Sequence, residues 1–155
     1  SACSSDSAEP VGLEKRDARG TNHNNDPVTV AAQNAFKNSR ASALAKDKDA
    51  RDSFIKLRNG EKSRVTILKE LGRIIIKEVR SGSVNTALEE KKADQMELVQ
   101  ESQADVALLL EELADNQKLY IAAANSSVEA LLNRTRVYAE FREYRRNLTH
   151  VIWYA

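Results

Sequence analysis

The sequence predicts an all-α protein: an antiparallel helical hairpin or elongated helical bundle with a long, coiled-coil-like C-terminal helix. Three observations support this fold class. Only five glycines and two prolines occur in 155 residues, and the alternating pattern of a half-buried strand is hard to find. Neither glycine nor proline occurs after Gly82, so residues 83–155 contain no strong helix breaker. Apolar residues in that stretch recur at seven-residue spacing, which is typical of helices packed along a seam.

The first 26 residues differ in composition from the rest of the chain. They are polar, rich in Ser, Asn and charged residues, and contain few apolar side chains. Such a segment buries too little apolar surface to offset the entropy lost on ordering, so we expect a disordered or extended tail. Residues 27–155 are expected to form a single helical domain. Asp26-Pro27 marks its start, because Asp suits the N-cap and Pro the first helical position.

The segment after Pro27 predicts three helices, at about 27–46, 50–58 and 61–80. Charges alternate at 46–52, which indicates a linker or a solvated face. Asn59-Gly60 is typical of a helix end or a local kink. The third helix is the most amphipathic, and its apolar stripe is Val65, Leu68, Leu71, Ile75 and Val79, broadened by Ile74 and Ile76.

A turn and a long helical element follow. Arg80-Ser81-Gly82-Ser83 is a turn by composition, and Thr86-Ala87-Leu88-Glu89 has the form of a capping box, with Thr86 as the expected N-cap. We predict helices at about 86–124 and 127–153. A second capping box, Ser126-Ser127-Val128-Glu129, leaves open whether these two helices are continuous or separated by a break at 125–127.

Two rows of residues at heptad spacing predict the seam of the long element, one starting at position 96 and the other at position 99. The apolar seam residues are Met96, Val99, Val106, Leu110, Leu113, Tyr120 and Leu131. Gln103 and Gln117 fall in the first row, and such polar residues lower stability while they fix register and partner number. Leu109, Val128, Leu132 and Val137 widen the apolar stripe, which favours a bundle with more than one neighbouring helix.

Charge is distributed unevenly along the chain. Residues 37–80 contain 13 Lys and Arg against 6 Asp and Glu, whereas residues 89–115 contain 2 Lys and 9 Asp and Glu. A basic helix joined by a turn to an acidic helix predicts an antiparallel hairpin with complementary flanks. Single exposed ion pairs contribute at most about 1 kcal/mol, so the pattern selects partner and orientation more than it adds stability.

Arginines and aromatic residues alternate in the last 22 residues. The candidate interaction surface is Arg134, Tyr138, Phe141, Arg142, Tyr144, Arg145, Trp153 and Tyr154. One interpretation is a terminal bundle helix whose aromatic residues are core and whose arginines are solvated. Another is a docking surface for a protein, because Arg and aromatic residues are enriched at interfaces. Nucleic acid or lipid headgroups are a third interpretation, which Glu140 and Glu143 disfavour by diluting the positive charge.

Patterns typical of catalysis are missing from the sequence. His23 and His150 are the only histidines, and neither has a metal-ligand residue four positions later. The acidic residues at 89–105 lack the Glu-x-x-His pattern of a metal-binding bundle, and the glycines are too isolated to form a phosphate-binding loop. We therefore expect no enzyme activity, no cofactor and no metal site. A small enzyme with no recognisable motif remains as a disfavoured alternative.

The first five residues, Ser1-Ala2-Cys3-Ser4-Ser5, resemble the end of a bacterial lipoprotein signal, in which small residues precede the lipidated cysteine. The resemblance implies that Cys3 carries a lipid anchor and that the protein belongs to the cell envelope. Two alternatives remain open: an ordinary tail with a free thiol, and a cytosolic chain that has lost its initiator Met. The body of the chain resembles no family.

These observations together favour a non-enzymatic helical structural or adaptor subunit, which self-associates or docks onto a protein partner in a larger assembly. The alternative is a lipid-anchored bacterial envelope protein with a helical periplasmic or surface domain. The net charge of +1 predicts no general affinity for nucleic acid. The longest compact apolar run, Ile74-Ile75-Ile76, is far shorter than a transmembrane segment. A cell-envelope or secreted location is favoured over a cytoplasmic one.

Overall fold

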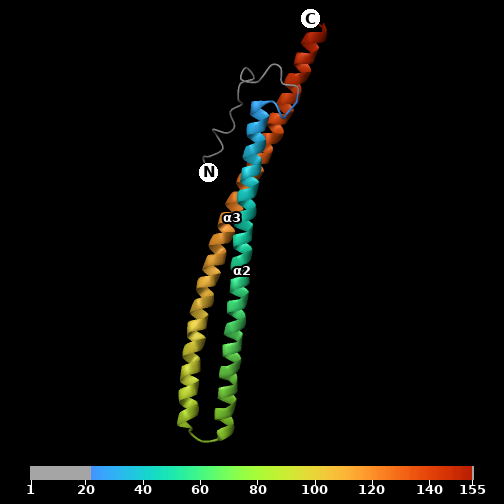
Figure 1. Ribbon diagram of the computed structural model, residues 1–155. Helices are drawn as coiled ribbons and strands as arrows, with labels where there is room; N and C mark the ends of the chain where they lie inside the picture. Colours follow the sequence, from blue (N-terminus) through green and yellow to red (C-terminus); the bar gives the residue numbers. More distant parts are fainter. Residues whose placement is uncertain (1–21, 155) are drawn as a thin grey trace. The chain divides into compact units, whose positions relative to one another are not determined.

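The computed structural model describes residues 22–154, with the side chains of 152–154 excepted, and this part of the chain forms two α-helices and no strand. Helix α2 spans Pro27–Ser81, and helix α3 spans Thr86–Tyr154. The helices run antiparallel and are joined by a short turn (Figure 1). The predicted fold class, an all-α helical hairpin, is confirmed.

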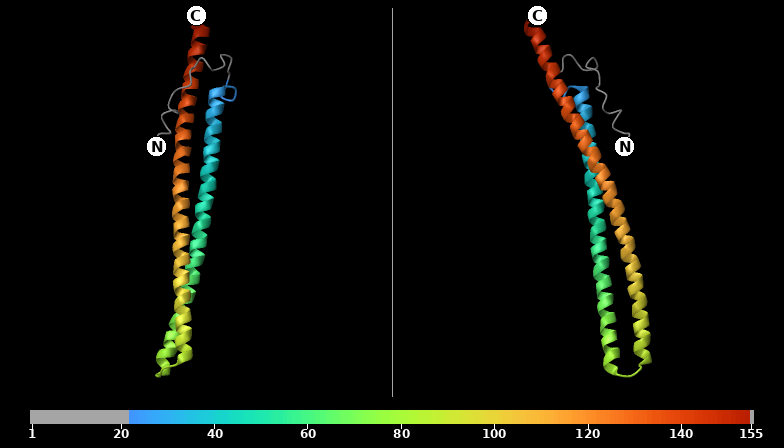
Figure 2. Two further views of the ribbon diagram at one scale, coloured as in Figure 1. Left: turned by 90° about the vertical axis from the view of Figure 1, so that its left-hand side faces the viewer. Right: turned by 180° about the vertical axis from the view of Figure 1, so that it is seen from behind.

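The helices divide into two compact units. Unit 1 contains the described residues up to Lys46 together with those from Tyr120 onward, and unit 2 is Asp47–Leu119. Within each unit a segment of α2 lies alongside a segment of α3, as the views in Figure 2 show. That residues 27–155 behave as a single domain stays a prediction.

The start of α2 follows the sequence signal. The backbone N–H of Thr29 donates to Oδ2 of Asp26 at 3.0 Å, so Asp26 acts as the N-cap ahead of Pro27. The hydroxyl of Thr29 donates to the backbone carbonyl of His23 at 2.6 Å. Both Asp26 and Thr29 are almost fully buried, so this cap also holds residues 23–26 against the helix.

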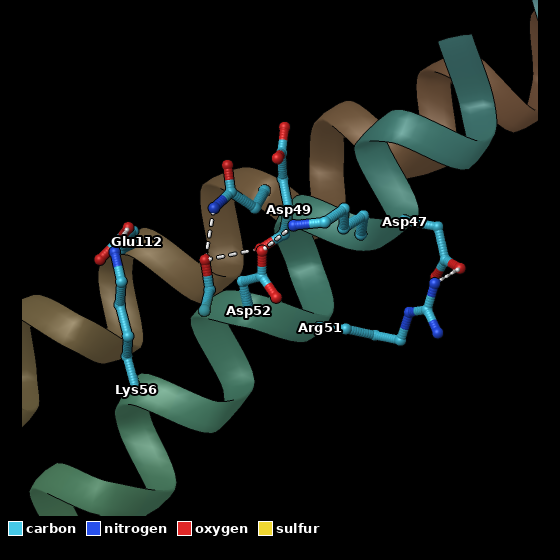
Figure 3. A network of polar contacts seen from close by, with 9 residues as sticks. Asp47, Asp49, Arg51, Asp52, Lys56 and Glu112 are labelled. Atoms are coloured by element: carbon cyan, nitrogen blue, oxygen red, sulfur yellow. Dashed lines mark hydrogen bonds and ion pairs between the residues drawn. The ribbon is translucent and has the colours of Figure 1, made fainter. Parts of the chain in front are cut away.

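Helix α2 is a single helix of 55 residues, which corrects the prediction of separate helices at about 27–46, 50–58 and 61–80. The alternating charges at 46–52 form ion pairs between residues four apart, Lys48 with Asp52 at 2.7 Å and Arg51 with Asp47 at 3.2 Å (Figure 3). Pairs at this spacing stabilise a helix rather than interrupt it. The hydrogen bond between Lys48 and Asp52 also lowers the pKa of Asp52 and raises that of Lys48.

Gly60, which suggested a helix end, lies in the interior of α2. A methyl group at this position would lie 2.8 Å from Cδ1 of Leu109 and 3.8 Å from Cγ2 of Val106. The missing side chain therefore leaves room for α3 to approach the α2 backbone. Close helix packing is the physical reason for this glycine, and the helix continues through it.

The turn between the helices lies where the sequence placed it. Gly82 adopts a positive φ of 65°, which is favourable for glycine and typical of the residue that follows a helix. Oδ1 of Asn85 accepts a hydrogen bond from the backbone N–H of Leu88 at 3.3 Å. Asn85 rather than the expected Thr86 is thus the N-cap of α3, because an Asn side chain directly before the helix reaches its free N–H groups.

Helix α3 is continuous for 69 residues. It therefore has no break at 125–127, where the sequence left open whether one or two helices form. Ser126 and Glu129 lie within the helix, where the backbone N–H groups that a capping box would satisfy are already bonded to carbonyls one turn earlier. The C-terminal segment therefore runs on as part of α3, and it does not form a third helix.

Candidate interaction surface

The two helices of unit 2 meet along a seam with strict heptad spacing. The α2 positions of this seam are buried or partly buried, and they are Ala50, Ser53, Leu57, Gly60, Arg64, Ile67, Leu71, Ile74 and Glu78. The α3 positions are likewise shielded, and they are Leu88, Lys92, Gln95, Val99, Ser102, Val106, Leu109, Leu113 and Asn116. Spacings of three and four alternate without exception, which keeps one face of each helix toward the other.

The seam of α3 agrees with one of the two predicted rows and corrects the other. Val99, Val106 and Leu113 lie in the seam, and Leu113 is only 8% exposed. Met96, Leu110 and Leu131 of the row that starts at 96 are exposed by 48%, 55% and 39%, and Tyr120 of the row that starts at 99 is also exposed. The row that completes the seam lies one residue before the predicted row that starts at 96, at Gln95, Ser102, Leu109 and Asn116. Its polar members hid it from a pattern based on hydrophobicity.

Polar residues in this second row bind across the seam. Nδ2 of Asn116 donates to the hydroxyl of Ser53, and Nε2 of Gln95 donates to the backbone carbonyl of Ile67 at 3.1 Å. Hydrogen bonds between shielded polar groups are geometrically demanding, because a shift in register leaves their partners unsatisfied. These two contacts therefore fix how far α2 and α3 are offset along their length.

Two ion pairs between described residues connect the helices of unit 2. Lys56 on α2 pairs with Glu112 on α3 at 3.1 Å, in the sense that the charge pattern predicts (Figure 3). Lys92 on α3 pairs with Glu78 on α2 at 2.9 Å, so in this pair the acidic residue comes from the helix that the charge pattern marks as basic. The other ion pairs within the described part of the chain lie inside a single helix. Much of the basic charge of α2 and the acidic charge of α3 is thus left unpaired across the seam.

The Lys56–Glu112 pair defines one side of the hairpin. Each of these residues directly precedes a seam residue, Leu57 or Leu113. In an antiparallel pair of helices, positions that precede this seam row lie on one side of both helices, and positions that follow the other row lie on the opposite side. The side opposite Lys56 and Glu112 therefore combines residues from both helices.

This opposite side carries a second set of heptad-spaced residues, which we term the lateral face. Its α2 members are Val65, Leu68, Gly72, Ile75 and Val79, and its α3 members are Ala93, Met96, Gln100, Gln103 and Ala107. Val79 is 73% exposed, Met96 48% and Ile75 43%. None of the ten residues is charged. The lateral face is thus an uncharged, partly apolar strip on a chain in which 30% of residues are charged.

The sequence pattern contained the lateral face but assigned its residues to the wrong contact. Val65, Leu68, Ile75 and Val79 were predicted to form the stripe of α2 that packs within the hairpin, and Met96 to form part of the seam of α3. The structure uses Ile67, Leu71 and Ile74 for the seam. Of these three, Leu71 was predicted within the stripe and Ile74 beside it. The available signal was the width of the apolar stripe: residues 65–79 of α2 contain two apolar rows side by side, more than a single partner helix covers.

Unit 1 contains most of the predicted Arg/aromatic surface, and it buries part of it. Phe141 has no exposed surface and is a core residue, which corrects its assignment to a docking surface. His23 stacks on Tyr138 with ring centroids 4.5 Å apart and lies 5.1 Å from the ring of Phe141. The guanidinium of Arg134 lies 5.2 Å from the ring centroids of both Phe36 and Tyr138.

The remaining residues of that predicted surface differ in position. Tyr144 is partly buried beside Phe141, with ring centroids 6.5 Å apart, while Arg142 and Arg145 are exposed. Trp153 and Tyr154 lie within α3, but their side chains are outside the described part of the structure. Phe141 is therefore buried in unit 1 and Tyr138 and Tyr144 are partly buried there, while Arg142 and Arg145 are exposed. That the exposed residues of this segment bind a protein stays a prediction.

Unit 1 also contains an open groove of about 440 Å³. Its lining residues are Gln33, Phe36, Lys37, Arg40, Ala41, Leu44 and Arg134. Arg134 is already stacked on two aromatic rings, and the groove is wide open to solvent, so it offers shallow basic surface rather than an enclosed site.

Residues 22–154 hold no group of three or more potential metal-ligating side chains. A search of the same residues found no helix that combines the length and hydropathy required to span a membrane. Cys3, the predicted lipidation site, lies outside the described residues, so lipid anchoring and an envelope location stay predictions. No known protein family matches the chain, and neither the curated proteins nor the solved structures contain a match.

Proposed function

We propose that the protein is a non-enzymatic helical subunit, structural or adaptor in kind, that acts by binding another protein through its lateral face. The observation that carries this proposal is the second heptad-spaced row on each helix of unit 2. The residues of the intramolecular seam are shielded, whereas Ile75, Val79 and Met96 lie outside the seam and keep much of their surface exposed. Exposed apolar residues gathered in a strip, as opposed to scattered singly, mark an interaction site.

The chemistry of the lateral face fits a helical protein partner. Rows spaced by three and four residues present ridges and grooves along the helix axis, which another helix fills by the same knobs-into-holes packing that the seam uses. Gly72 adds to this fit, because a Cβ built there has open space around it and an approaching side chain can reach the α2 backbone. The face lacks the basic residues that phosphate groups require, which argues against nucleic acid as its ligand.

The proposal is tested by photo-cross-linking in the cells that produce the protein naturally. A photoreactive residue at Val79 or Met96 should give a covalent adduct of discrete mass. Lys77 and Leu98 are matched controls, because each is an exposed residue two positions away on the same helix and on another side of the hairpin. Adducts confined to Val79 and Met96 support the proposal. Absence of adducts there, or equal yields at all four positions, refutes it.

A further inference from the structure

Building on the proposed function, we infer that the lateral face binds the lateral face of a second copy of this chain. Two copies of unit 2 then form a four-helix bundle, with their turns at the same end. In this arrangement α2 of one copy lies against α3 of the other, and each helix has two antiparallel neighbours. Four features of the lateral face support this particular partner and geometry.

The first feature is the absence of charge on the lateral face itself. A partner surface that carried charged residues would lose hydration on contact without gaining an opposite charge. The partner must therefore be an uncharged, partly apolar strip of similar width. The lateral face of a second copy meets this requirement, and a two-fold axis along the bundle brings the two strips together over their whole length.

The second feature is complementarity of size between the two helices. The contacts Ser53–Asn116 and Gly60–Leu109 set the levels of the hairpin and place Ile75 about level with Ala93, and Gly72 about level with Met96. With the turns at the same end, Ile75 of one copy meets Ala93 of the second copy, and Gly72 meets Met96. Large side chains thus oppose small ones at these two levels, which is how facing layers of a bundle interdigitate.

The third feature is charge along the outer edges of the lateral face. Exposed Lys69 directly follows Leu68 of its α2 row, and exposed Glu97 directly follows Met96 of its α3 row. Exposed Lys62 and Glu111 continue these two edges at heptad spacing just beyond the face. When α2 faces α3 of the second copy, the basic edge meets the acidic edge, with Lys69 less than one helical turn from the level of Glu97. The alternative bundle, in which α2 faces α2, would bring lysines together. Complementary edges select the first arrangement, since like charges in contact suppress the wrong one.

The fourth feature is size. Fourteen residue steps along each helix span about 21 Å, and two helices side by side are about 20 Å wide. The lateral face therefore covers on the order of 400–500 Å² per copy, which corresponds to about 1,000 Å² for a dimer, the lower limit for a specific interface. The dimer is expected to be weak and dependent on concentration, so a trapping experiment suits it best.

The test uses the full chain with Cys3 replaced by Ser and with single cysteines added. One chain, carrying a size tag, has Ile75→Cys, and a second, untagged chain has Ala93→Cys. Oxidation of the mixture should form mainly the mixed disulfide, in clear excess over the two symmetric disulfides. The matched control is Lys77→Cys mixed with Lys91→Cys, because these exposed residues lie at the same levels on the opposite side of the hairpin. The control mixture should give only the slow yield of random collision.

Light scattering over a range of concentrations supplies an independent measurement. The unmodified chain should shift from monomer toward dimer, Ile75→Glu should weaken the dimer at least tenfold, and Leu98→Glu should leave it unchanged. A strict monomer overturns the second-copy inference, and symmetric disulfides at Ile75 overturn the geometry. The proposed function survives either result if Val79 still cross-links to a different protein in cells, and it fails with the inference if no adduct forms.

Discussion

Unit 1 and unit 2 use the same heptad seam but fill it differently. Unit 1 packs aromatic rings around a fully buried Phe141, and residues 23–26, which precede α2, cover that end of the seam. Unit 2 fills its seam with aliphatic and polar residues, while large apolar side chains such as Phe54 and Ile75 stay 53% and 43% exposed. The two units differ in what covers their apolar residues. Two helices share only one seam, and no described segment covers the second apolar row of unit 2. We therefore expect substitutions in unit 1 to test stability and substitutions on unit 2 to separate stability from association.

The largest expected effect is that of Phe141→Ala in unit 1. Truncation of a fully buried Phe removes its transfer free energy and leaves a cavity beneath His23 and Tyr138, so the free energy of unfolding should fall by about 4 kcal/mol. Chemical denaturation followed by circular dichroism measures this change. The control is Arg142→Ala at the exposed neighbouring position, which should change stability by less than about 0.5 kcal/mol. Equal effects of the two substitutions would contradict the aromatic core of unit 1.

A slightly smaller effect is expected for Leu113→Asp in unit 2. Leu113 is 8% exposed in the seam, so a carboxylate there loses hydration without gaining a partner, at a cost of about 3 kcal/mol. Leu110→Asp is the matched comparison, because Leu110 lies three residues away and is 55% exposed. This second substitution should leave the melting temperature nearly unchanged. If both variants unfold alike, the seam of α3 does not follow the heptad described here.

This pair of leucines also shows how far the sequence could predict the structure. Helicity, the turn, the antiparallel pairing and one row of the seam all follow from local signals: few breakers, a glycine-containing turn and apolar heptads. The second row was displaced by one residue, because Gln95, Ser102 and Asn116 are polar and their role in the seam depends on contacts with α2. A single helix cannot reveal which of two adjacent apolar rows its partner covers.

The breaks predicted in α2 failed for a related reason. In the sequence alone, Gly60 and the charges at 46–52 fit either a helix break or a continuous helix, since a glycine can end a helix and can also allow another helix to pack closely. The contact with Leu109, 49 positions later in the sequence, decides between these possibilities. The candidate surface was found in part: its α2 residues were identified as an apolar stripe, yet their exposure depends on the rotation of the helix that the seam fixes. Phe141 was misplaced because its burial requires His23, which the sequence assigned to a tail.

Smaller effects on stability are expected at the two glycines of α2 in unit 2, where one substitution should stabilise the protein and the other should not. Gly72→Ala should stabilise the helix by about 1 kcal/mol, because alanine restricts the unfolded chain and a Cβ at this position meets open space. Gly60→Ala gains the same propensity but forces the side chain of Leu109 to move away from its methyl group, so its net effect should be close to zero. Thermal unfolding of both variants gives the comparison. A gain at Gly60 equal to that at Gly72 would show that α3 does not approach α2 closely there.

The smallest expected effect is a loss of local helix stability near Glu61 as the pH falls. The hydrogen bond from Arg64 holds the pKa of Glu61 below its ordinary value, and Lys48 does the same for Asp52, both on α2 within unit 2. A carboxyl whose pKa is lower in the folded state stabilises that state above its unfolded pKa, and this contribution disappears as pH falls through the folded pKa. Both pairs are solvated, so the loss should appear as lower protection against amide exchange at 58–64, relative to the intrinsic rate at each pH, rather than as global unfolding. In Glu61→Gln the protection at these residues should no longer fall in acid, while that near Asp52 still should. Identical acid responses in the variant and the parent chain would mean that the Glu61–Arg64 pair contributes nothing to the local stability of α2, and that the apolar seam alone keeps unit 2 folded.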